Sequence, residues 1–442
     1  MINARAGKKP KKFNISAYVV RQLGDQLISD EITALIELVK NSYDADASRV
    51  NIVIDTTTAY EEEDLTKTAF KKEPLVGYVS ISDTGTGMDE KDIAEGWLQI
   101  SFSNKRGINE LGTKTNRYKR AVLGSKGVGR LSTQRLGNQL DMFSLKNHYD
   151  EKTDTWHLRN DGIHVGIGWN DFKEDVNLED VPVFYESWAP KNGRPGTKLI
   201  ITDLQNPDVW AKEDSRKALI GTLAQLISPF EPARDFQLNL KINNKFYDLF
   251  ELTKSVRDTA ISTYRFSFDG KNLRIKGKVK ASLFRGGNTT AEERDFKMLI
   301  AEDNGAAFFK FLKNGKGTNN LQEGTGGWLF EYEISLQASS LGLVEEWVPA
   351  SARPFDAYPL EEETPRLNLQ KKAFVNPGKF HGEIDQLAYD NVEAITPDAV
   401  FSQIGEYKAY IKRQSGVRIY RNGFGIRPYG IDGDDWMGFQ SG

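Results

Sequence analysis

The stretch Glu37-Leu-Val-Lys-Asn-Ser-Tyr-Asp-Ala45 decides the fold of this chain. Its spacing predicts a helix, because apolar side chains repeat at helical intervals and form one stripe: Ile32, Leu35, Ile36 and Val39. Glu37, Asn41 and Asp44 recur on nearly the opposite face. A carboxylate one turn from a carboxamide can address one small volume, the first as a base for water and the second as an oxygen ligand of Mg²⁺.

A second stretch, Asp83-Thr-Gly-Thr-Gly-Met88, follows the apolar run 77–82 and is therefore expected at the end of a strand. Its aspartate can accept a hydrogen bond, and Gly85 and Gly87 let the backbone approach a ligand closely. Taken alone, each stretch also has a plainer interpretation, as a solvated helix face and as a simple turn. Together, in this order, they indicate a nucleotide site.

Two glycine segments strengthen this interpretation. Gly124-Ser-Lys-Gly-Val-Gly129 precedes a good helix opening, and glycines beside a helix N-terminus offer N–H groups to phosphates. Alone, such a motif is weak. Further on, the turn 194–197 leads into an apolar strand, so the hydroxyl of Thr197 could reach a base or a bound water.

With these four motifs in this order, residues 15–205 resemble the GHKL ATPases: gyrase B subunits, MutL, the ninety-kilodalton heat-shock chaperones, histidine kinases and Morc proteins. The resemblance implies ATP and Mg²⁺ as cofactors, Glu37 as the base that activates water, Asn41 as the Mg²⁺ ligand, and Asp83 as the acceptor for the adenine amino group, helped by Thr197. It further implies a mobile lid over the phosphates. The remaining expected nucleotide contacts are Asp44, Gly85, Gly87, Met88, Lys105, Gly124, Lys126, Gly127, Val128 and Gly129.

Several cations of the expected lid could neutralise phosphates: Lys105, Arg106, Lys114, Lys119, Arg120 and Lys126. We favour Lys105, because a serine-rich turn followed by lysine recurs at this place in Morc-like relatives, and Lys126, because it lies inside the glycine motif. Histidine kinases are disfavoured, because no phosphoacceptor histidine precedes the first motif. The histidines all follow it: His148, His157, His164 and His381.

Composition bounds the remaining choices. The chain has 442 residues, which suggests two or three domains, and a net charge of −3, which does not predict nucleic-acid binding. It has no cysteine, so disulfides and thiolate zinc sites are excluded. Because no apolar run is long enough to span a bilayer and no signal peptide is present, we expect a cytoplasmic protein with no membrane partner.

The expected fold class is α+β: a GHKL (Bergerat) α/β sandwich, with a mixed sheet covered by helices on one face, followed by a transducer-like, ribosomal S5-like α/β domain. We expect a flexible basic arm at 1–14, the ATP-binding domain at 15–230 and the transducer-like domain at 231–442. A helix is expected at 89–100, another at 205–230, and helical runs within 378–415. The strand Ile419-Tyr-Arg-Asn-Gly423 is the specific part of the transducer match.

One departure from the family concerns the γ-phosphate sensor, because relatives continue beyond the Tyr-Arg-Asn strand with more transducer and a basic contact residue. Either the sensor lies elsewhere, with Arg353, Arg366 and Lys371 as weak candidates, or the chain is a truncated form of a longer protein. We favour truncation, which leaves turnover less certain than binding.

Three function classes stay open. The leading one is an ATP-dependent homodimerising switch of the Morc/MutL-like type, acting on DNA or a partner protein in a bacterial DNA-related or phage-defence setting. The others are a chaperone-like ATPase and a non-catalytic nucleotide-sensing scaffold.

Overall fold

The computed structural model describes a little over half of the chain. The described residues are 14–61, 70, 75–99, 114–120, 122–123, 129–150, 152–158, 161–189, 196–228, 235–250, 257–258, 260–280, 318–323, 330–337, 379–387, 405, 408–409, 419–421 and 424–427. The chain divides into a first unit, Met1–Thr253 with Arg413–Gly442, and a second unit, Lys254–Lys412.

The first unit begins with two helices. They are α1 (Tyr18–Leu27) and α2 (Glu31–Asp44). Asp30 begins α2 as its N-cap, and its Oδ1 accepts a hydrogen bond from the Thr33 N–H at 2.8 Å. The later helices are α4 (Ser132–Leu136), α5 (Pro207–Ala211) and α6 (Glu213–Ala224). The helix expected at 205–230 is therefore two shorter helices, and that expected at 89–100 contains a π-helical turn at Asp92–Trp97.

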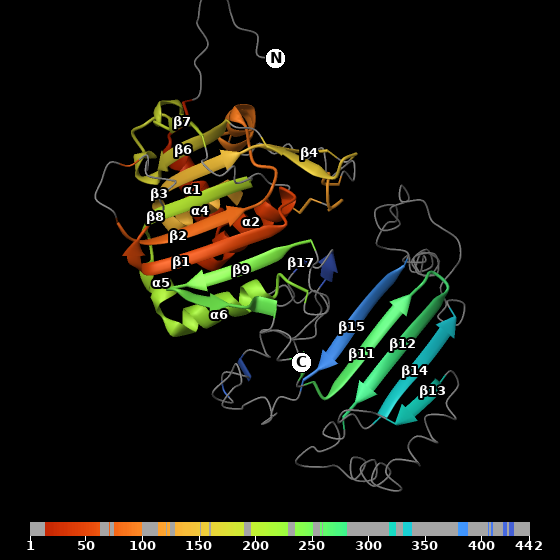
Figure 1. The fold of residues 1–442 in the computed structure, drawn as a ribbon. Helices are drawn as coiled ribbons and strands as arrows, with labels where there is room; N and C mark the ends of the chain where they lie inside the picture. The colour runs from red at the N-terminus through yellow and green to blue at the C-terminus, as the bar shows by residue number, and fades with distance from the viewer. Residues whose placement is uncertain are drawn as a thin grey trace, which may run out of the picture. The chain divides into compact units, whose positions relative to one another are not determined.

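Eight described strands of this unit form one mixed sheet in the order β10-β9-β1-β2-β8-β3-β6-β7 (Figure 1). Their bounds are β1 Arg49–Ala59, β2 Val76–Asp83, β3 Gly137–Leu145, β6 Gly162–Gly168, β7 Phe184–Trp188, β8 Gly196–Leu204, β9 Gln237–Ile242 and β10 Lys245–Tyr247. β1 and β9 pair in parallel, whereas the other neighbours pair antiparallel. A separate hairpin joins β4 (Asn147–Asp150) to β5 (Thr155–Leu158).

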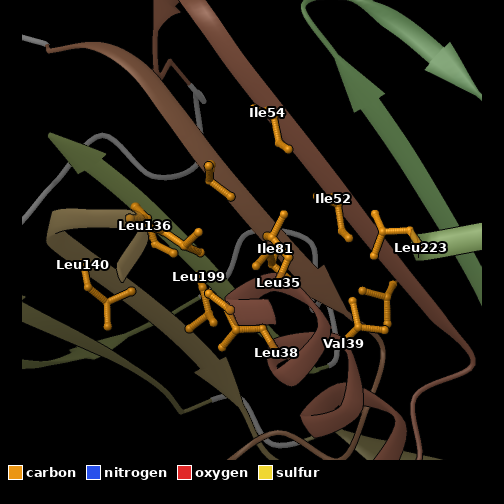
Figure 2. Close-up of a cluster of buried hydrophobic side chains, with 14 of the residues drawn as sticks. Leu35, Leu38, Val39, Ile52, Ile54, Ile81, Leu136, Leu140, Leu199 and Leu223 are labelled. Atoms are coloured by element: carbon orange, nitrogen blue, oxygen red, sulfur yellow. The ribbon is translucent and has the colours of Figure 1, made fainter. Parts of the chain in front are cut away.

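The main core lies between the helices and one face of this sheet. Figure 2 shows Leu35, Leu38 and Val39 of α2 directed toward the sheet side chains Ile52 and Ile81. All five are at most 4% exposed. The stripe expected on α2 is therefore its buried face in part, and the helix is fixed in place by apolar burial rather than by helical propensity.

The first sheet extends beyond the expected domain boundary at residue 230. β9 and β10 complete one edge of it, because β9 alternates apolar side chains and pairs in register with β1. The hairpin β16 (Ile419–Arg421) and β17 (Phe424–Arg427) also belongs to the first unit, although the Tyr-Arg-Asn strand was expected in a separate transducer domain. Local sequence patterns predicted β9 and the Tyr-Arg-Asn strand, but not the unit to which each belongs.

The described part of the second unit is a five-stranded sheet in the order β13-β14-β12-β11-β15. Its strands are β11 Ser262–Phe268, β12 Asn272–Val279, β13 Thr318–Glu323, β14 Phe330–Gln337 and β15 Phe380–Gln386. Every pairing among these described strands is antiparallel. β15 occupies part of the segment 378–415 where helical runs were expected; it pairs with β11 along its whole length.

Among the helices that the structure describes, none combines the length and apolar character needed to cross a bilayer.

Candidate nucleotide site

The helix α2 presents Glu37 and Asn41 away from its buried stripe, and both residues are partly exposed. The Glu37 Oε1 forms an ion pair with the Lys40 Nζ at 2.8 Å, and about a third of the Glu37 side chain (32%) is exposed. A partly exposed carboxylate on a rigid helix has the chemistry of a base that deprotonates water. Sequence reasoning did not single out Lys40. Its position three residues after Glu37 on a helix was the signal that could have predicted the ion pair.

Asp83 ends β2 and is held by three hydrogen bonds. Its Oδ1 accepts from the N–H of Gly85 at 2.8 Å and of Thr197 at 3.2 Å, and its Oδ2 accepts from the Ser42 Oγ at 3.0 Å. Desolvation nevertheless raises the pKa of Asp83 to about 6, against the lowering effect of these bonds. Asp83 is half-buried as a residue, and its Oδ2 accepts only one of the three hydrogen bonds, so that oxygen has a lone pair with which it could accept a further hydrogen bond from a ligand.

Thr197 enters the site through a hydroxyl relay. The Thr197 Oγ1 lies 2.9 Å from the Ser144 Oγ, and that oxygen accepts a hydrogen bond from the Met88 N–H at 2.8 Å. The relay links β8, β3 and the turn after β2. Ser144 is fully buried on β3, and like Ser42 it was missed by sequence reasoning, because an isolated serine carries no motif.

Two glycines make this end of the site sterically possible. Gly87 has φ +64°, and a Cβ there would collide with the carbonyl of Leu145. Gly196 has φ +99°, and a Cβ there would collide with the carbonyl of Asp83. Side chains other than glycine are strained at these φ values, so both turns depend on glycine.

The turn after β2 is also fixed by charge. The Lys146 Nζ pairs with Asp89 at 3.0 Å and with Asp92, just beyond Met88. Desolvation lowers the pKa of Lys146, but hydrogen bonds and attraction from the two aspartates outweigh it and raise the pKa above its usual value. This cluster holds the start of the π-helical turn against the end of β3.

The described end of the glycine motif lies directly against α2. A Cβ on Gly129 would lie 2.8 Å from the Asn41 Nδ2, so the carboxamide sits immediately beside the glycine backbone. A 3-10 turn at Gly129–Leu131 then leads into α4. Five other expected nucleotide contacts lie outside the described residues. They are Lys105, Gly124, Lys126, Gly127 and Val128.

The segment before the glycine motif is tied to the loop after α2. The Leu123 N–H donates to the Asp44 Oδ1 at 2.7 Å, and the N–H of Arg117 donates to the Asp46 Oδ2, also at 2.7 Å. Asp44 was expected as a nucleotide contact, and the structure places this carboxylate, 8% exposed, in support of the neighbouring backbone.

Arg120 was one of the six cations that could neutralise phosphates, although not one of the two that we favoured, and its burial removes it from that set. Its side chain is fully buried and donates to the backbone carbonyls of Tyr43 at 3.2 Å, Ala47 at 2.7 Å and Asp235. Sequence alone could not distinguish a buried arginine from the exposed cations around it.

The three motifs therefore meet in the first unit. Asn41 contacts Gly129 on one side, and the loop after α2 contacts the Asp83 turn on the other, since the Thr86 N–H donates to the Ala45 carbonyl at 2.8 Å. No group of three or more histidine, aspartate or glutamate side chains suited to a metal ion occurs within the described ranges.

Residues 29–165 match the family model described as "Histidine kinase-, DNA gyrase B-, and HSP90-like ATPase". The match supports GHKL membership for this region. It covers about a third of the chain, and it contains Glu37, Asn41, the Asp83 turn and the glycine motif. The mixed sheet of the GHKL region fits the expected α+β class, whereas the match does not extend to the second unit. No curated protein matches the chain.

Proposed function

We propose that the first unit binds Mg-ATP and hydrolyses it. The observation that carries this proposal is the convergence just described: the α2 carboxamide lies against the glycine segment, and the loop after α2 is hydrogen-bonded to the turn that follows Asp83. The ligand that suits such a site has phosphates at one end and a hydrogen-bonding base at the other. Asp83 would accept from the adenine amino group, with Thr197 beside it.

The residues present fit magnesium as well as nucleotide. Mg²⁺ is usually held by one or two side-chain oxygens together with phosphate oxygens and waters. The Asn41 carboxamide would supply the protein oxygen beside the glycine backbone. Bound there, the ion would neutralise phosphate charge.

In this mechanism Glu37 takes a proton from the attacking water. The Lys40 ammonium, 2.8 Å from the Glu37 carboxylate, would hold that carboxylate in one orientation. Asp83 orients the base at the far end, and backbone N–H groups of the glycine segment bind phosphate oxygens.

The test is hydrolysis by Glu37→Ala in the full chain. A general base contributes about 10²–10⁴-fold, so we expect turnover to fall by at least about 10²-fold while ATP still binds. Glu179→Ala, which removes an exposed carboxylate from the 3-10 turn Leu178–Asp180, should hydrolyse ATP as the wild type does. Wild-type turnover in Glu37→Ala would assign the base to another residue.

We also propose that nucleotide binding controls a homodimer, in the manner of Morc and MutL proteins, and that the dimer acts on DNA or a partner protein, with phage defence as one setting. Support comes from the resemblance of the motifs and of the Tyr-Arg-Asn strand. The GHKL region commonly dimerises in its relatives. Whether DNA or client proteins stimulate ATP hydrolysis separates this proposal from a chaperone-like ATPase. Whether any activity depends on Glu37 separates it from a non-catalytic scaffold.

A further inference from the structure

Arg120 is a buried cation that contacts the loop after α2, next to the proposed site. The guanidinium of Arg120 bonds to three backbone carbonyls, and its Cζ lies 4.5 Å from the ring centroids of both Tyr43 and Tyr118 and 5.4 Å from that of Phe236. Removing a charge from water is costly unless every contact is well placed. Nη1 and Nη2 reach backbone carbonyls and hold the cation in place, whereas the buried Nε has no hydrogen-bond partner among the described residues.

The carbonyls it binds belong to the connection between the two ends of the site. The Arg120 Nη1 bridges the carbonyls of Tyr43 and Ala47, on either side of Ala45. The Ala45 carbonyl accepts a hydrogen bond from the Thr86 N–H, in the turn that follows Asp83. The helix α2, which ends at residue 44, carries Asn41. A cation at a helix C-terminus also complements the helix dipole. Arg120 thus binds both ends of the segment 43–47, which connects the proposed metal-binding end of the site to its proposed base-binding end.

Phe424, near the C-terminal end of the sequence, packs against the segment 43–47 through Tyr43. Phe424 of β17 is fully buried and stacks on Tyr43, with centroids 4.5 Å apart and planes at 22°. It also meets Phe236 edge to face at 5.2 Å. The hairpin is anchored beside it, since the Gly425 N–H donates to the Leu226 carbonyl at 2.8 Å.

We propose that Arg120 and Phe424 are positioning residues of the nucleotide site. They hold the segment 43–47 and so set the separation between Asn41 at the phosphate end and Asp83 at the base end. This inference rests on the proposed function. A ligand that spans both ends depends on that separation, whereas a ligand that occupies only the base end does not.

The experiment compares ATP turnover with inhibition by adenosine, which carries a base and no phosphate. Arg120→Lys keeps the charge, but one ammonium cannot reproduce the planar fork that serves three carbonyls. Phe424→Ala removes the stacked ring. A displacement of about 1 Å can cost roughly 10²-fold in rate, so we expect kcat to fall on that scale in both variants. The inhibition constant for adenosine should stay at its wild-type value.

Phe246→Ala is the matched control, because that phenylalanine lies on β10 of the same sheet and is 65% exposed. It should leave both quantities unchanged. Thermal unfolding of each variant identifies the temperature range in which it is folded, and the kinetics are measured there.

The positioning role is overturned if both Arg120→Lys and Phe424→Ala turn over ATP as the wild type does. It is also overturned if ATP turnover and adenosine inhibition weaken together, which is the result of a general loss of structure. A wild-type chain that neither binds nor hydrolyses ATP would instead refute the proposed function itself. The wild-type measurement therefore separates the two failures.

Discussion

At the scale of single residues, Asp83 is the side chain that we propose recognises the base, and its ionisation is linked to folding. Desolvation raises its pKa from an ordinary value of 3.8 to about 6. The folded protein therefore holds this proton to higher pH than the unfolded chain does. The contribution of Asp83 to stability is most favourable below about pH 4 and falls as pH rises toward and through 6.

We predict two measurable consequences. Adenosine should bind more tightly as pH rises from 5 to 7, with a midpoint near 6, because the ionised carboxylate is the better acceptor. Asp83→Asn should bind adenosine weakly at every pH and should unfold at a higher temperature than the wild type at pH 7.5, because no charge is desolvated. Adenosine is the appropriate probe, since it has no phosphate that titrates in this range. A pH-independent affinity in the wild type would contradict this role for Asp83.

The residues of the site differ in how far sequence could predict them. Glu37, Asn41, Asp83 and Thr197 belong to patterned segments whose spacing or flanking glycines carry chemical meaning. Ser42 and Ser144 became visible only through their hydrogen bonds to Asp83 and Thr197. The burial of Arg120 could not be predicted, because it depends on aromatic rings that include Phe236, which is distant in sequence.

At the scale of elements, the position of α2 decides whether its side chains reach the glycine segment. Asp30 caps its N-terminus by accepting from the Thr33 N–H and from the hydroxyls of Ser29 and Thr33. Burial raises the pKa of Asp30, but these hydrogen bonds together lower it below its usual value. The cap is therefore ionised and stabilising above about pH 4, and its contribution is lost as pH falls through the folded-state pKa.

We predict that Asp30→Ala lowers the free energy of unfolding by about 0.5–2 kcal/mol at pH 7, the usual cost of losing an N-cap. Asp30→Asn, which keeps a capping oxygen, should lose much less at that pH. The difference between Asp30→Ala and wild type should shrink in acid. Chemical denaturation at pH 7 and pH 3 measures both effects, and equal losses at the two pH values would rule out the charged cap.

Elements were predicted better than their assembly. Apolar and polar residues alternate in the sequence at 236–242, 264–268, 273–279 and 327–335, which predicts strands there, and the structure has β9, β11, β12 and β14 in these segments. These patterns could not show that β9 pairs with β1, because pairing depends on contacts between segments nearly two hundred residues apart. The same limit applies to β17, whose Phe424 packs in the first unit although its sequence resembles a transducer strand.

At the scale of the whole molecule, we predict ATP-dependent dimerisation. The wild-type protein should be monomeric or weakly dimeric alone and dimeric with Mg²⁺ and a non-hydrolysable ATP analogue, because phosphate binding would present a new two-fold surface. Removing residues 1–12 should weaken the dimer and leave nucleotide affinity nearly unchanged. Sedimentation at concentrations well above micromolar measures this, and an unchanged mass with and without the analogue would exclude the switch.

The central claim is that Mg-ATP binds where α2, the Asp83 turn and the glycine segment meet, and calorimetric titration of the full chain tests it most directly. The wild type should bind Mg-ATP at one site. In Asp83→Asn the amide oxygen can still accept from the N–H groups of Gly85 and Thr197, and the amide nitrogen can donate to the Ser42 Oγ, but the acceptor facing the adenine amino group is lost. The affinity should therefore fall by roughly 1.5–3 kcal/mol, the scale of a charge-assisted hydrogen bond. Asp175→Asn, at an exposed position, should match the wild type. No heat of binding in the wild type, or equal affinities in the wild type and Asp83→Asn, would contradict the account.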